Sequence, residues 1–71
     1  MKDDILKKFG KRVQELRRQK GITSQMALAN KAGLDRTYVG GIERGERNVA
    51  LKNMEKITKA LDIGLDELFK F

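Results

Sequence analysis

The sequence contains no cysteine, histidine, proline or tryptophan. Without cysteine it has no disulfide, thiol nucleophile or thiolate metal site, and without histidine it lacks the commonest general base and metal ligand. No apolar stretch approaches the roughly 20 residues that span a bilayer. A chain of 71 residues also leaves little room for a substrate pocket. These absences argue against an enzyme, a metal or cofactor site and a membrane protein.

The length and composition of the chain predict one all-helical domain over residues 1–71. Helices are favoured because proline is absent and the aliphatic residues are spaced rather than run together. The first four residues lack the apolar run of a signal peptide, so we expect a cytoplasmic protein. Leu6, Phe9, Val13 and Leu16 form the stripe of an amphipathic helix. We expect helices over about 4–19, 24–31, 36–43 and 51–61, and a final helical turn over 65–70.

The second and third predicted helices are joined by a short turn over residues 32–35, which contains Gly33. A short turn with a glycine is typical of a helix-turn-helix motif, whose second helix meets base edges with its first residues. Here these residues include Arg36, suited to a bidentate contact with guanine, and Thr37, which can offer a hydroxyl or a methyl group. We expect Gly41 to let the two helices approach closely.

Charge is distributed unevenly along the chain. Residues 1–20 hold eight basic and three acidic side chains, whereas residues 51–71 hold four of each. The basic part suits a polyanion, although it could equally be a solvated helix surface that steers DNA at long range. The neutral part ends in five large apolar side chains, which either close the monomer core or form a dimer interface. We favour the interface, and its predicted residues are Ile63, Leu65, Leu68, Phe69 and Phe71.

Several runs of residues carry a resemblance to a known family. Ser24-Gln25, Leu28-Ala29, residues 31–38 and residues 41–45 resemble the XRE (Cro/phage-repressor) family, and within it the controller proteins of restriction–modification systems. The resemblance implies a five-helix, lambda-repressor-like domain with its helix-turn-helix at the second and third helices. It also implies dimerisation through about residues 51–71 and a near-palindromic operator, often upstream of the protein's own gene.

The resemblance also implies roles for individual residues. Those expected to contact bases are Arg36, Thr37 and Arg47, and those expected to contact the DNA backbone or the narrow central groove are Gln25, Tyr38, Arg44, Asn48 and Lys52. Tyr38 could instead pack on the edge of the core. Glu43 would repel phosphate, so we expect it to bind Arg12 or Arg17 of the first helix.

Two departures from the family pattern bear on the fold. Ile22 is expected to fill the apolar position that Thr23 does not, and Ala50 is a weak N-cap for the fourth helix. The alternative function is that of an antitoxin-type or phage-type repressor, whose C-terminal end binds a partner protein. The sequence indicates no cofactor and no small-molecule effector.

Overall fold

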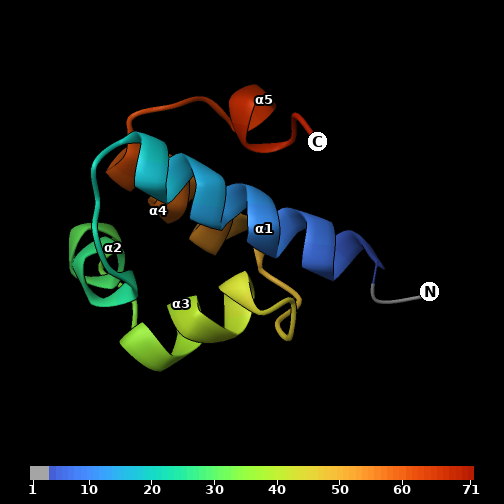
Figure 1. Cartoon of the computed structure of the whole chain (residues 1–71), viewed down its shortest axis with the longest axis horizontal. Coiled ribbons are helices and arrows are strands. Elements are labelled where there is room, and N and C mark those ends of the chain that lie inside the picture. The colour runs from blue at the N-terminus through green and yellow to red at the C-terminus, as the bar shows by residue number, and fades with distance from the viewer. Residues whose placement is uncertain (1–3) are drawn as a thin grey trace.

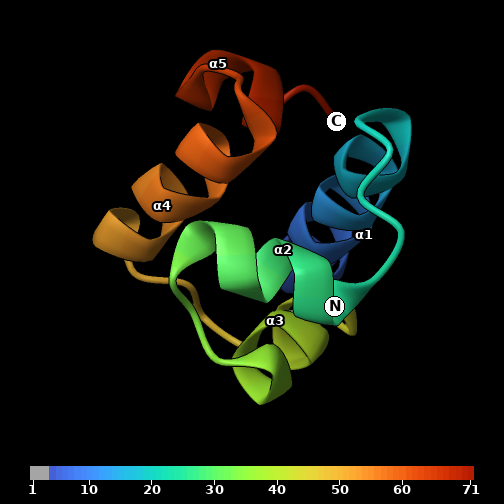
Figure 2. The same cartoon turned by 90° about the vertical axis from the view of Figure 1, so that its left-hand side faces the viewer.

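Five α-helices follow one another in the computed structural model, which describes residues 4–71 apart from the side chain of Asp4. They are α1 (Asp4–Gln19), α2 (Gln25–Ala32), α3 (Arg36–Glu43), α4 (Leu51–Leu61) and α5 (Leu65–Leu68). The long α1 runs through the middle of the molecule, with α3 on one side of it and α5 on the other (Figure 1). Seen from the end, α2 lies between α3 and α4 (Figure 2). The all-helical fold predicted from the sequence is confirmed, and no helix of the described residues has the length and apolar character of a membrane span.

The helix boundaries follow the capping residues. Ser24 is the N-cap of α2, where its hydroxyl accepts a hydrogen bond from the Ala27 N–H at 3.0 Å, so α2 begins one residue later than predicted. Asp35 caps α3 by accepting from the Thr37 N–H at 2.9 Å. Gly33, at φ 69°, ends α2 in the left-handed conformation. As expected, Ala50 gives α4 no side-chain cap.

The two chain-terminal helices remain. From the sequence, Asp3 or Asp4 is the predicted cap of the first helix, and both side chains lie outside the described part of the chain. The last helix, α5, ends at Leu68 rather than near residue 70.

The core lies where α1, α2, α3 and α4 converge and is closed by α5. Its fully buried large side chains are Val13, Leu16, Leu28, Val39, Ile42, Ile57, Leu61 and Leu68. Ile22 is 9% exposed and joins this cluster, as the sequence predicted. Leu68 is 0% exposed and packs inside the monomer, so its assignment to a dimer interface is wrong. The short α5 therefore uses one apolar side chain to close the monomer core.

The close helix approach that was expected at Gly41 occurs at a different glycine. A Cβ at Gly41 would meet the side chain of Arg47, so this glycine does not mediate a close approach to α2. The tight helix crossing is at Gly10, where a Cβ would collide with the carbonyl oxygen of Ile42 and stand 2.9 Å from that of Glu43. The backbones of α1 and α3 touch at this point because Gly10 has no side chain.

We expect the substitution Gly10→Ala to destabilise the fold by about 1–3 kcal/mol, because a methyl group would be forced against the backbone of α3. The clash must exceed the gain of about 1 kcal/mol in helix propensity. Thermal unfolding followed by circular dichroism measures the change, with Lys11→Ala, at an exposed position of the same helix, as the control. A melting temperature equal to or above that of the wild type would show that the crossing tolerates a side chain.

Candidate nucleic-acid interface

A buried ion pair links the C-terminal ends of α1 and α3. The Arg17 Nε donates to Glu43 Oε2 at 2.7 Å, and the two side chains are 6% and 1% exposed. Arg17 also donates from Nη2 to Glu43 Oε1 at 3.2 Å and from Nη1 to the Ile22 carbonyl at 3.0 Å. Of the two partners expected for Glu43, the structure selects Arg17. Such a bidentate, fully bonded pair fixes the orientation of α3 against α1.

Gln25, at the start of α2, joins the same network. Its side-chain Nε2 donates to Glu43 Oε1 at 3.1 Å, so α2 is tied to both other helices. The residue is half-buried, and its amide keeps a second N–H for another acceptor. The residue expected to bind phosphate is therefore also part of the scaffold that holds the helix-turn-helix.

The first turn of α3 faces solvent. Arg36 and Thr37 are both exposed, and within the described chain the Arg36 guanidinium forms no ion pair. The opposite side of α3 is buried through Val39 and Ile42. The leading turn of this short helix thus projects outward, as recognition by a helix-turn-helix requires. These two side chains are free to approach the edges of bases in a groove.

Tyr38 and Arg47 lie together beside that turn. The guanidinium carbon of Arg47 stands 5.7 Å from the centre of the Tyr38 ring, a cation–π distance. The Tyr38 hydroxyl accepts a hydrogen bond from Asn53 Nδ2 of α4 at 3.1 Å. Tyr38 is half-buried and packs against the core, so its alternative role at the core edge is real, and it also supports Arg47.

Arg44, Asn48 and Lys52 are exposed around the connection from α3 to α4. Arg44 forms an exposed ion pair with Glu46 at 3.1 Å, with side-chain exposures of 57% and 59%. Such a pair contributes little to stability and leaves the guanidinium able to exchange partners. All three side chains are therefore accessible in the segment that follows α3.

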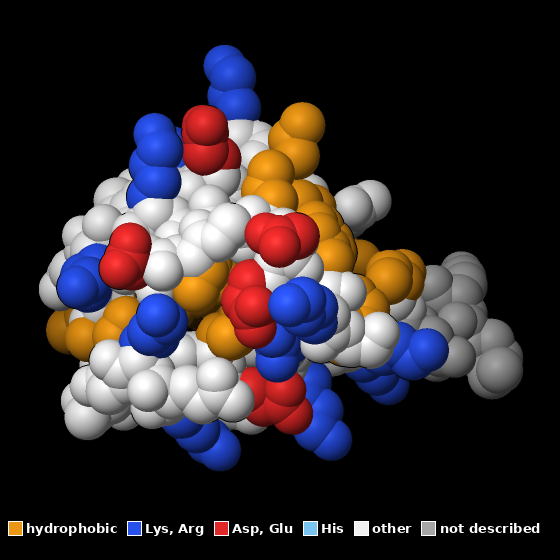
Figure 3. Space-filling model, turned by 90° about the horizontal axis from the view of Figure 1, so that it is seen from above, with side chains coloured by type: hydrophobic (Ala, Val, Ile, Leu, Met, Phe, Trp, Pro, Cys, Tyr) orange, Lys and Arg blue, Asp and Glu red, His pale blue; other side chains and the backbone are white. Residues whose placement is uncertain are grey.

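The C-terminal end presents a different surface. Ile63 is partly buried against the core, whereas Leu65, Phe69 and Phe71 are exposed by 40%, 45% and 51%. Leu51 of α4 is 68% exposed and lines a shallow, mostly apolar groove with Leu65, beside the side chains of Lys52 and Glu55. We call the four exposed residues, Leu51, Leu65, Phe69 and Phe71, the C-terminal face. Viewed from the α5 side, the longest run of hydrophobic side chains lies in the right-hand half of the molecule, and smaller groups lie at the centre and on the left (Figure 3).

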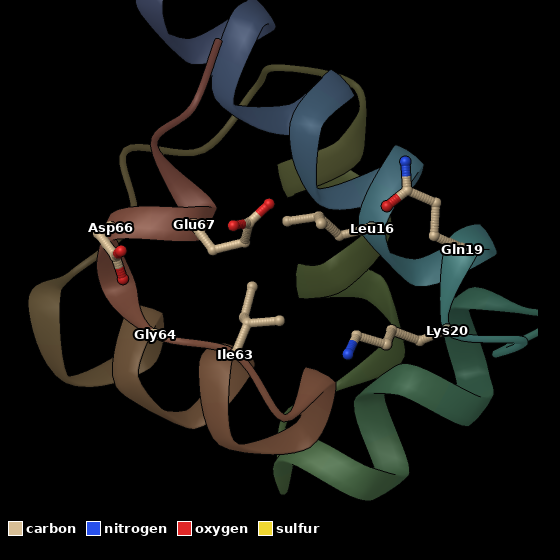
Figure 4. Close-up of a pocket in the computed structure, with 7 residues that line it drawn as sticks. All are labelled: Leu16, Gln19, Lys20, Ile63, Gly64, Asp66 and Glu67. Atoms are coloured by element: carbon tan, nitrogen blue, oxygen red, sulfur yellow. The ribbon is translucent and has the colours of Figure 1, made fainter.

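The larger hollow lies away from α3, between the C-terminal end of α1 and the segment that leads into α5. Its volume is about 410 Å³, and Gln19, Lys20, Ile63 and Glu67 are among its lining residues (Figure 4). Glu67 already binds Arg12 through Oε2 at 2.8 Å and Lys70 through Oε1 at 3.3 Å. The hollow is open and mostly polar. Two carboxylates line it, those of Asp66 and Glu67, and the Glu67 carboxylate is engaged within the chain.

Sequence reasoning missed the role of Asn53 and the partner of Arg12. Asn53 holds Tyr38, and Arg12 binds the backbone oxygen of Glu67 at 2.9 Å, which fixes α5 on α1. Asn53 had no signal beyond its place near the start of a helix. Arg12 had one, because it was a candidate partner for a buried carboxylate, but its partner is in α5.

Comparison with known proteins gives consistent results. A family model described as helix-turn-helix matches residues 13–68. The chain is 48% identical over 67 residues to the control protein C.MunI of a Mycoplasma species, covering 94% of this chain and 90% of that protein. It is 45% identical over 71 residues to the control protein C.BamHI of Bacillus amyloliquefaciens, covering 100% and 88%. The crystal structure of the restriction-modification controller protein C.AhdI from Aeromonas hydrophila superposes with a TM-score of 0.86 at 58% identity, covering 90% of this chain and 96% of that one.

We expect Glu43→Ala to lower the free energy of unfolding by about 3–5 kcal/mol, because Arg17 would remain buried without its partner. Urea denaturation measures this loss. The control is Glu46→Ala, which removes the exposed partner of Arg44 and should cost about 0–1 kcal/mol. Equal effects of the two substitutions would mean that the buried pair does not hold α3 in place.

Proposed function

Because the chain belongs to the XRE-type helix-turn-helix family, in the branch of the restriction–modification controller proteins, we propose that it binds an operator upstream of its own gene as a dimer. The family consists of DNA-binding transcription regulators and not of enzymes. The observation that carries the proposal is the exposed first turn of α3, held outward by the buried pair of Arg17 and Glu43. Since its ligand is DNA, the protein would act in the cytoplasm.

Base recognition is assigned to three side chains. Arg36 projects from the first turn of α3 and suits a bidentate contact with guanine, while Thr37 beside it suits a hydroxyl contact or the methyl group of thymine. Arg47, held over Tyr38, adds a second guanidinium next to that turn. Together they would read one half-site in the major groove.

The surrounding polar residues would hold the duplex by its backbone. They are Gln25, Tyr38, Arg44, Asn48 and Lys52. Contacts of this kind fix the position of a protein on DNA and make binding depend on salt, but they carry no sequence information. The second N–H of the Gln25 amide and the exchangeable Arg44 guanidinium suit phosphate oxygens.

The C-terminal face is proposed as the dimer interface. Its four exposed apolar side chains are large for a surface that stays in water, and the last 21 residues carry no net charge that would oppose self-association. A two-fold dimer through this face would set two copies of α3 on a near-palindromic operator, with half-sites roughly 34–36 Å apart. The alternative occupant, a different protein as in an antitoxin, is an outcome of the dimer test below.

We expect Arg36→Ala to weaken binding to the operator by about 1–3 kcal/mol and to relax the preference at one base pair per half-site. Arg44→Ala is the matched control. It removes an exposed arginine assigned to phosphate, so it should weaken binding to operator and unrelated DNA alike and reduce the salt slope by about one. Fluorescence anisotropy with both duplexes at several salt concentrations separates the two effects. If Arg36→Ala weakens both duplexes equally, Arg36 does not read bases.

We expect Leu65→Glu to weaken dimerisation at least tenfold, because each protomer would lose the burial of one leucine, worth roughly 1.5–3 kcal/mol. Sedimentation velocity over a range of concentrations measures the dimer. The matched control is Met26→Glu, another exposed apolar side chain replaced by a carboxylate, but on α2 and outside the C-terminal face. A wild-type chain that stays monomeric at high concentration would contradict the homodimer and favour a different protein on this face.

A further inference from the structure

We infer that Gly41 determines specificity by leaving room for Arg47 to lie across α3 beside Tyr38. This inference rests on the proposed function, since it concerns how one of the three base-reading side chains is held. Gly41 touches no DNA in this account. It is a positioning residue that acts through Arg47.

The first argument is steric. A Cβ at Gly41 would stand 2.9 Å from Arg47 Cγ, 3.1 Å from its Nε and 3.6 Å from its Cδ. The three nearest atoms all belong to this one side chain. Gly41 also lies inside an α-helix, a backbone that accommodates alanine. Alanine is also the better helix former. The substitution would therefore displace Arg47 while preserving α3.

The second argument is that the base of Arg47 is fixed to α3. The N–H of Glu46 donates to the Gly41 carbonyl at 2.9 Å, and the N–H of Gly45 donates to the Ile42 carbonyl at 3.0 Å. Gly45 adopts φ +78°, so the chain turns sharply there. These bonds hold the two residues before Arg47 against the end of α3, so the Arg47 side chain begins close to Gly41.

The third argument concerns the direction of the guanidinium. Tyr38 precedes Gly41 by three residues and lies on the same side of the helix. Its ring lies under the Arg47 guanidinium, and its hydroxyl is held by Asn53 from α4. We call Gly41 and Tyr38 the Arg47 platform. The platform holds the guanidinium against Tyr38, which belongs to the same turn as Arg36 and Thr37, so less rotamer freedom is lost on binding.

The test is a selection on randomised duplexes, which gives the base preference at every position for the wild type, Arg47→Ala, Gly41→Ala and Gly40→Ala. Arg47→Ala should reduce the preference at one base pair of each half-site by about 5-fold to 150-fold, the value of one bidentate contact. Gly41→Ala should reduce the preference at that same base pair by about fivefold or more. The variant that combines Arg47→Ala with Gly41→Ala should lose no more preference at this base pair than Arg47→Ala alone, because both substitutions remove the same interaction.

Gly40→Ala is the matched control. Its Cβ would meet Gln25 Oε1 at 3.0 Å and Arg44 Nη1 at 3.2 Å, and not Arg47. It gives α3 the same gain in helix propensity and disturbs two proposed backbone contacts. It should therefore weaken binding to all sequences and leave the preference at the Arg47 base pair intact.

A measurement on the free protein checks the cause. In the wild type, the Tyr38 ring should shift the NMR signals of the Arg47 Hδ protons upfield, and Gly41→Ala should abolish this shift without lowering the melting temperature. Unfolding of Gly41→Ala would assign the glycine a structural role and overturn the inference. An unchanged preference at the Arg47 base pair, or an equal loss at all positions, would also overturn it. If the wild type shows no base preference at all, the proposed function itself is overturned. If Arg36→Ala reduces the base preference and Gly41→Ala does not, the inference about Gly41 fails and the proposed function stands.

Discussion

The buried ion pair of Arg17 and Glu43 decides where α3 points. Two adjacent glycines make α3 a weak helix on its own, so its position depends on what its ends bind. Burying two charges is costly, and the cost is offset here because each oxygen of Glu43 accepts a hydrogen bond and Arg17 also reaches the Ile22 carbonyl. The pair fixes the position of α3, because any other placement of this helix would leave a charge unpaired in the core. The outward turn of Arg36 and Thr37 follows from this constraint.

The helix α1 connects the two surfaces of the molecule. Arg17 docks α3 on one side, and Arg12, five residues earlier, docks α5 through the backbone and side chain of Glu67. The rings of Phe9 and Phe69 add a tilted aromatic contact, with centroids 5.7 Å apart. Because both surfaces are fixed to one rigid helix, the distance from the C-terminal face to α3 is set within each protomer. A dimer built on this face would therefore set the spacing between the first turns of its two α3 helices.

The sequence predicted the helices well because local signals determine their limits. These signals are the capping residues Ser24, Asp35 and Gly33 and the spacing of apolar residues. It also predicted that Glu43 must be paired, since a carboxylate beside phosphate needs a cation. It placed Leu68 wrongly at the dimer interface, because apolar residues in a last helix suit a core or a partner equally. The roles of Gly10, Gly41 and Asn53 depend on which residues of different helices meet in the fold. The spacing of residues along the sequence does not predict these contacts.

The central claim is that the first turn of α3 meets base edges. The most direct measurement is a set of intermolecular NMR contacts between the labelled protein and a duplex from upstream of its own gene, which is practical for a chain of 8.1 kDa. The account predicts contacts from the side chains of Arg36 and Thr37 to major-groove protons, at two equivalent half-sites. Contacts confined to the basic face of α1, with none from this turn, would contradict it.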